Sequence, residues 1–162
     1  MLTKLKKQLD ILTKSKEFDS KGYFCSAFIM SEFKDLKEQN WQLDFYDEKK
    51  DRITSYVVLP SIKKINDEAE VYQESKIKLN KLELTSKLIE FNKILEISSE
   101  ELTKTSETPN KTIVVLQNDG KNMIWNMSFV TNSFNLINLR IEAITGKILD
   151  NKKVELLNWN AK

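Results

Sequence analysis

The side chains that most often carry catalysis are scarce in this chain. It contains no histidine, and so it lacks the commonest general base and the commonest transition-metal ligand. Its single cysteine, Cys25, lies in the apolar run YFCSAFIM, which favours a small buried residue over a reactive thiol. One cysteine cannot form an internal disulfide or a thiolate metal cluster, and it fits a reducing compartment.

Carboxylates are the remaining groups with catalytic potential. None of their clusters follows the spacing of a calcium loop, so we interpret them as solvated loops or helix-terminal charges and expect no metal and no cofactor. Two carboxylates that converge in a cleft, with at least one raised pKa, would be needed for a hydrolase without histidine. The clusters are Asp47-Glu48 with Asp51, Asp67-Glu68 with Glu70, and Glu100-Glu101.

Charge and hydropathy exclude two classes of partner. There are 26 basic and 24 acidic residues, a net charge of +2, and Arg occurs only at Arg52 and Arg140. A nucleic-acid surface usually needs a stronger positive field and more guanidinium groups, so we expect no nucleic-acid partner. No run of about 18 apolar residues exists, which argues against a membrane span. Lys residues interrupt the apolar N-terminus, which argues against a signal peptide, so the expected location is the cytoplasm.

Two short stretches share one pattern. WQLDFY from Trp41 and WNMSFV from Trp125 each have an aromatic first residue, apolar third and fifth residues, and polar residues between them, which is typical of a strand with one buried face. We favour Trp41 and Trp125 as core anchors under a helix; the alternative is that they contact a ligand or a partner.

The elements around these strands follow the same order in both halves. In the first half, leucines at helical spacing predict a helix over 2–18, and strands are expected at 23–30, buried on both faces, at 41–46 and at 53–59. In the second half, Leu84, Leu88, Phe91, Ile94 and Leu95 predict a helix capped by Thr85 or Ser86, with a separate turn at 98–101. Strands are then expected at 112–117, 123–131, 134–144 and 148–157.

This order predicts an α+β protein of two similar modules, each a helix on an antiparallel sheet (α-β-β-β). The offset between Trp41 and Trp125 is 84 residues, close to half of the chain. The expected organisation is an N-terminal module at 1–60, a connector at 61–83 with one or two short elements, and a C-terminal module at 84–162. The two modules are expected to share an interface or to join their sheets, since each is small.

The stretch WNMSFVTNSFNLINLRIEAITGKIL resembles the PepSY domain, which has a Trp-led strand and then a strand ending in Ile-Asp-Ala-x-Thr-Gly-x-Val. Ile141, Ala143, Thr145, Gly146 and Ile148 match this ending, while Glu142 replaces the Asp. The resemblance covers about 84–150; the first half shares only its outline. It implies a cystatin-like fold and a non-enzymatic, regulatory role that includes peptidase inhibition, commonly outside the cytoplasm. We expect Thr145-Gly146 to be a hairpin turn and not a phosphate site.

Three functional hypotheses remain from the sequence. The leading one is a non-catalytic binding or regulatory protein, with another protein as its partner. The second is a carrier that holds an apolar small molecule between helix and sheet, near Trp41 or Trp125. The third is the carboxylate hydrolase without histidine. The oligomeric state does not follow from the sequence.

Overall fold

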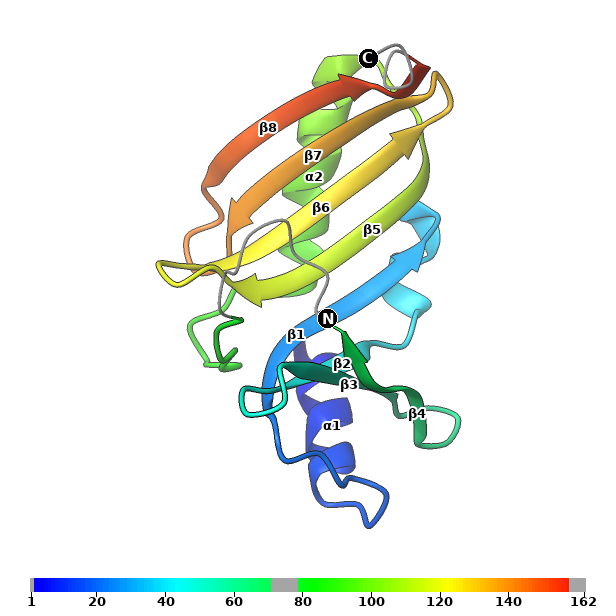
Figure 1. Ribbon diagram of the computed structural model, residues 1–162. Coiled ribbons are helices and arrows are strands. Elements are labelled where there is room, and N and C mark those ends of the chain that lie inside the picture. The colour runs from blue at the N-terminus through cyan, green and yellow to red at the C-terminus, as the bar shows by residue number, and fades with distance from the viewer. Residues whose placement is uncertain (1, 71–78, 158–162) are drawn as a thin grey trace.

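One antiparallel sheet of eight strands runs through the protein, with a helix from each half of the chain on one of its faces (Figure 1). This computed structural model describes residues 2–70 and 79–157, and for 67–70 the backbone only. The α+β class is therefore confirmed. The elements are α1 (Leu2–Thr13), β1 (Tyr23–Ser31), a 3-10 helix η1 (Phe33–Glu38), β2 (Gln42–Asp47), β3 (Arg52–Val57), β4 (Lys63–Glu70), α2 (Phe91–Thr105), β5 (Pro109–Asn118), β6 (Met123–Thr131), β7 (Asn135–Glu142) and β8 (Ile148–Glu155).

The two halves of the chain meet in the middle of the sheet. The strand order is β4-β3-β2-β1-β5-β6-β7-β8, so β1 and β5 are the central strands. They pair antiparallel, with Ala27 opposite Leu116 and Ile29 opposite Val114. All four of these side chains are buried, and one continuous core contains residues of both halves. The two sheets are thus joined edge to edge, as the small size of each half had suggested.

Helix α1 is shorter than expected. Leu2, Leu5 and Leu12 are buried in the core, as the leucine spacing predicted. The helix ends at Thr13 and not near residue 18, because the next residues form local turns: the Ser15 amide bonds the Leu12 carbonyl at 3.0 Å, and the Glu17 amide bonds the Ser15 hydroxyl at 3.1 Å. Phe18 then turns back and packs on Phe45, with ring centroids 4.8 Å apart.

Strand β1 was expected to be buried on both faces, and this was wrong. Phe24, Ala27 and Ile29 are buried on the helix side, while Phe28 is half-buried and Met30 is 45% exposed on the other side. The strand is central, but both helices lie on the same side of the sheet, so β1 has one fully covered face. Figure 1 shows α2 behind the sheet and the opposite face toward the viewer.

The first hairpin matches its prediction. Trp41, Leu43 and Phe45 alternate with half-buried polar residues and are all buried. The charged residues 47–51 connect β2 to β3, with Asp51 in the left-handed region at φ 51°. The Asp47 carboxylate accepts the Lys49 amide at 3.0 Å, which fixes the turn.

The segment after Pro60, expected to be a connector with one or two short elements, contributes a whole edge strand, β4. It pairs antiparallel with β3, placing Lys63 opposite Val57. Its sequence KKINDEAE lacks strand alternation of apolar residues, which is why its place in the sheet was missed. Charged residues are typical of an edge strand because they discourage pairing with other chains, and β8 at the other edge carries ILDNKKVE.

Helix α2 begins seven residues later than Leu84, and neither Thr85 nor Ser86 caps it. The residues before it are tied to the sheet and lie outside the helix: the Leu82 amide bonds the Phe24 carbonyl, and the Ile89 amide bonds the Ala143 carbonyl, each at 2.8 Å. Leu88 is buried as expected, but in the turn that precedes the helix, where its amide bonds the Thr85 carbonyl at 3.4 Å. The helix starts at Phe91 after Glu90 and continues through 98–101, which form no separate turn.

The second half of the sheet follows its sequence pattern closely. Trp125, Met127 and Phe129 on β6 are fully buried, and so are Leu139 and Ile141 on β7. The turn between β5 and β6 uses Gly120 at φ 95°, and the Asp119 carboxylate accepts the Lys121 and Asn122 amides at 2.9 and 2.8 Å.

Candidate binding surface

Trp41 and Trp125 lie in the core and not on a surface. Their exposed fractions are 1% and 0%. The two indole rings have centroids 5.8 Å apart, and Phe91 in the first turn of α2 contacts both, at 5.3 Å from Trp41 and 5.1 Å from Trp125. The space between helix and sheet is therefore filled by three aromatic side chains at the place where a carrier would hold its ligand.

The backbone next to Trp41 is held by a buried side chain from α1. Gln8 is 1% exposed; its carbonyl oxygen accepts the Trp41 amide at 3.0 Å, and its amide donates to the Asn40 side chain at 3.1 Å. This pair of hydrogen bonds satisfies a backbone group before β2 begins and fixes where Trp41 enters the core.

The residues that resemble the PepSY ending form a tight structural turn between β7 and β8. The Glu142 carboxylate accepts the Thr145 amide at 2.7 Å and the Thr145 hydroxyl at 2.5 Å. Gly146 has φ 77°, and a Cβ there would lie 3.0 Å from the Ile97 side chain of α2. Thr145 and Gly146 are thus a hairpin turn, as expected, that is packed on the helix.

Cys25 shows no sign of reactivity. It is 4% exposed, and burial, with the Asp44 carboxylate nearby, raises the pKa of its thiol to about 12. A thiol with that pKa is almost wholly protonated at neutral pH, so the buried structural role predicted from the sequence is confirmed.

Five of the described carboxylates are stabilised as anions. Every carboxyl pKa whose shift is resolved is lowered, at Glu17, Asp19, Glu107, Asp119 and Glu142. Asp19 accepts hydrogen bonds from Lys64 and Tyr56, at 2.8 and 2.7 Å, which hold its pKa down. Among the described residues no three metal-ligating side chains gather. The side chains of Asp67, Glu68 and Glu70 lie outside the described part. The carboxylate hypothesis thus gains no support.

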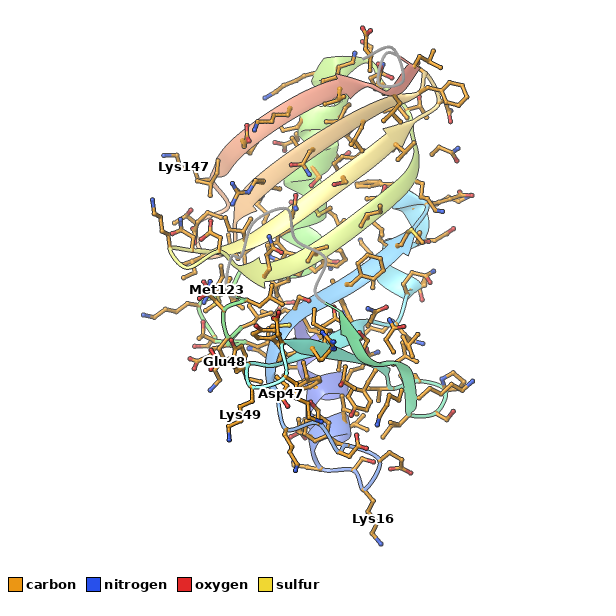
Figure 2. The ribbon with its side chains drawn as sticks, in the orientation of Figure 1. Lys16, Asp47, Glu48, Lys49, Met123 and Lys147 are labelled. Atoms are coloured by element: carbon orange, nitrogen blue, oxygen red, sulfur yellow. The ribbon has the colours of Figure 1, made fainter. Side chains whose placement is uncertain are left out.

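Two shallow hollows flank the β2–β3 connection, whose Asp47, Glu48 and Lys49 are labelled in Figure 2. They measure about 180 and 370 Å³ and share Lys21, Asp47 and Lys50. In the larger one Tyr23 and Tyr46 lie edge to face, and the Tyr46 hydroxyl donates to Asp51 at 2.6 Å, which raises the pKa of Tyr46 to about 12. Both hollows are lined by charges of both signs, so neither selects an obvious ligand.

The open face of the sheet carries an apolar band that sequence reasoning missed. Opposed residues on neighbouring strands share a face, and the pairs Met30–Ile113, Val130–Leu136 and Leu136–Val154 lie on the face opposite the helices. Phe134 extends the band at the β6–β7 turn, where its carbonyl accepts the Leu156 amide. The apolar band is thus Met30, Ile113, Val130, Phe134, Leu136 and Val154.

Phe134 is the most unusual member of the apolar band. It is 61% exposed, and its φ of 57° lies in the left-handed region that a bulky residue rarely adopts. Its turn is held firmly: the Phe134 amide bonds the Thr131 carbonyl at 3.1 Å, and the Asn135 side chain donates to Glu107 at 2.7 Å. The sequence Asn132-Ser133 predicted the turn, but no sequence signal revealed that Phe134 would point outward.

Comparison with known proteins gives a fold but no family. No protein-family model matches the chain, and no curated protein matches it. The chain is similar in structure to a putative lipoprotein from Clostridium difficile 630, with a TM-score of 0.50 and 14% sequence identity over 82% of this chain and 83% of that one. At this identity the likeness concerns the fold alone. Neither described helix has the length and apolar character needed to cross a membrane.

Proposed function

We propose that this protein is a non-catalytic binding or regulatory protein that acts through its surface on another protein. The observation that carries the proposal is the contact of Trp41, Phe91 and Trp125. A helix-on-sheet fold that carries a small molecule keeps a cavity between the two layers. Here the aromatic rings fill that layer, so recognition falls to the outside of the molecule.

We further propose that the two halves are related modules of a PepSY-like kind. Three features support this. Each half supplies one α-helix and then four strands among the described residues, with η1 as an addition in the first half. β1 and β5 pair antiparallel at the junction, and the two tryptophans lie at the second strand of their halves. The Thr145-Gly146 turn, packed on α2, fits the role that the resemblance gives it. A regulatory role, which includes peptidase inhibition, is what this resemblance adds.

The location of the protein is a separate proposal. The single buried thiol fits the cytoplasm, whereas the structurally similar protein is named a putative lipoprotein, which favours the cell envelope. Fractionation of the cells that make the protein distinguishes the two. Recovery in the soluble cytoplasmic fraction supports our expectation, and recovery with the membranes contradicts it.

The binding function is tested by isolating the full chain from its own cells and recording its mass under native conditions. We expect the mass of the chain bound to one protein partner, or the mass of the chain alone. We expect no additional mass from a bound small molecule. The immobilised chain should then bind one purified partner saturably. A small molecule that survives isolation would favour the carrier, and the absence of any saturable protein partner would overturn the proposal.

A further inference from the structure

We propose that the apolar band is the docking surface for an acidic protein partner, with Phe134 as its main anchor. This inference rests on the proposed function and identifies where, and with what chemistry, the partner binds. Three properties of the molecule support it. The band has exposed apolar side chains, Phe134 is held in a fixed geometry, and the neighbouring charges select one class of partner.

The band is exposed at its two ends and half-buried between them. Met30 at one end is 45% exposed, and Phe134 and Val154 at the other are 61% and 45% exposed. The band crosses β1, β5, β6, β7 and β8 at the end of the sheet where β6 meets β7, on the face turned toward the viewer in Figure 1. Both described helices lie on the other face. An apolar surface that exposes several large side chains is typical of a protein interaction site.

Phe134 is presented by a preorganised turn. The Thr131 hydroxyl accepts the Asn135 amide at 3.1 Å, and Lys153 on β8 holds the same Glu107 carboxylate as Asn135, at 3.0 Å. The end of β8 is tied to the turn because the Leu156 amide bonds the Phe134 carbonyl at 2.9 Å. An exposed aromatic ring on a rigid support loses little conformational entropy on binding, which is the usual character of an interface hot spot.

A phenylalanine at position 134 destabilises the turn, because a bulky residue is strained in the left-handed region. Asn or Gly adopts this conformation with less strain, so a turn selected only for stability would carry one of them. A strained residue that also exposes a large apolar side chain points to a function for that side chain.

Lysines are the charged side chains nearest to the band on the open face. Lys111 is adjacent to Val130 on the open face, and Lys152 lies on the same face one pair away from Val154. Lys152 also pairs with Asp150 at 3.2 Å, in solvent, where such a pair contributes little. Two rows of opposed residues cross the open face here, Lys111–Val130–Leu136–Val154 and Ile113–Ser128–Asn138–Lys152. The charged side chains in these two rows are lysines. A partner with an apolar socket and an acidic rim is therefore complementary, while a second copy would bring lysine rims together.

The test uses the full chain immobilised as bait in an extract of the cells that make it, followed by titration of the purified recovered protein. We expect Phe134→Asn to weaken binding at least tenfold with an unchanged or higher Tm, since Asn suits the backbone. Val154→Ser, at an exposed position of the edge strand β8, should also weaken binding. Ile11→Gln, at a similarly exposed apolar residue on α1, is the matched control and should change it less than twofold.

Charge reversal tests the acidic rim. We expect the double variant Lys111→Glu, Lys152→Glu to weaken binding, and we expect wild-type binding to weaken with added salt. Lys147→Glu, whose side chain points outward at the β7–β8 turn in Figure 2, is the control and should have no effect. Tighter binding by the double variant would overturn the acidic partner.

Three results would overturn the proposal of an acidic protein partner bound at this surface. These are a recovered partner that binds Phe134→Asn as tightly as wild type, Phe134-dependent binding of the chain to vesicles of anionic phospholipid, and Phe134-dependent self-association in sedimentation. In the first case the proposed function stands and only the surface is wrong. If wild type captures no protein, the proposed function fails as well.

Discussion

The indole rings of Trp41 and Trp125 lie against each other, with centroids 5.8 Å apart, although the residues belong to opposite halves of the chain. Phe91 is stacked on Trp125 at an interplanar angle of 26° and meets Trp41 edge to face. The core of one half is thus completed by an aromatic side chain of the other. This contact makes the halves interdependent in stability and removes the space that a ligand between helix and sheet would need.

Truncation of either ring should therefore destabilise the whole protein. We expect Trp125→Ala to lower the free energy of unfolding by about 3–5 kcal/mol, because a fully buried ring that contacts two others is lost. Urea unfolding followed by circular dichroism measures the change. Trp125→Phe, which keeps an aromatic ring, should cost much less. A loss below 1 kcal/mol for the alanine variant would mean that the rings are not packed as described.

The Thr145-Gly146 turn should tolerate no side chain at its glycine. A Cβ at Gly146 would lie 3.0 Å from the Ile97 side chain and 3.2 Å from that of Ile89, at a φ of 77°. We expect Gly146→Ala to cost roughly 1–3 kcal/mol through backbone strain and contact together. Gly120, at φ 95° with its nearest atom 3.4 Å away, is the control. Gly120→Ala introduces backbone strain without a close contact, so it should lower the free energy of unfolding by less than Gly146→Ala does. Equal losses for the two variants would contradict the packing of the Thr145-Gly146 turn on α2.

Glu107 should make the free energy of unfolding depend on pH in the acidic range. Hydrogen bonds from Lys153 and Asn135 lower its pKa to about 2 from an ordinary 4.5. A carboxyl with a lowered folded pKa stabilises the fold above pH 4.5, and this contribution is lost as the pH falls toward 2. Glu107→Gln should therefore unfold at a lower urea concentration than wild type at pH 7, with the difference shrinking as the pH approaches 2.

The exposed Glu83 gives the control for this titration. Its ion pair with Lys81 is 3.6 Å long, and both side chains are 64% exposed. Glu83→Gln should follow the wild-type pH profile closely. A Glu107→Gln profile that stays parallel to wild type from pH 7 to pH 2.5 would show that the pKa of Glu107 is not lowered.

Cys25 should be unreactive while the protein is folded. With a thiol pKa of about 12 and 4% exposure, we expect no alkylation by iodoacetamide at pH 8 over a time that fully modifies the urea-unfolded chain. Mass spectrometry counts the modified molecules. Rapid alkylation without denaturant would place Cys25 at an accessible surface and contradict the described strand pairing of β1 with β2.

Much of the fold could be predicted from the sequence, because one face of the sheet is buried and its strands therefore alternate apolar and polar residues. The alternation at 41–46 and 123–131 identified the strands and their core faces correctly, and the class followed from the order of elements. The start of α2 was misplaced because Leu84 and Leu88 continue a helical spacing that long-range hydrogen bonds to β1 and Ala143 override. Strand β4 was missed because an edge strand needs no apolar alternation.

The candidate surface was much harder to predict than the core. Trp41 and Trp125 were candidate contact residues because large aromatic side chains are common in binding sites. Both are buried in the core. Phe134 is the side chain that stays exposed, and in the sequence it follows a turn and begins a strand, like many buried residues. Its left-handed backbone and its apolar neighbours on five strands are brought together only when the sheet has formed.

Nuclear magnetic resonance titration of the ¹⁵N-labelled full chain with its purified protein partner tests the central claim most directly. We predict that the amides of Phe134, Leu136 and Val154 shift, while the indole signals of Trp41 and Trp125 stay where they are. Shifts of both indole signals with unmoved band amides would contradict the account, because they would place recognition between helix and sheet.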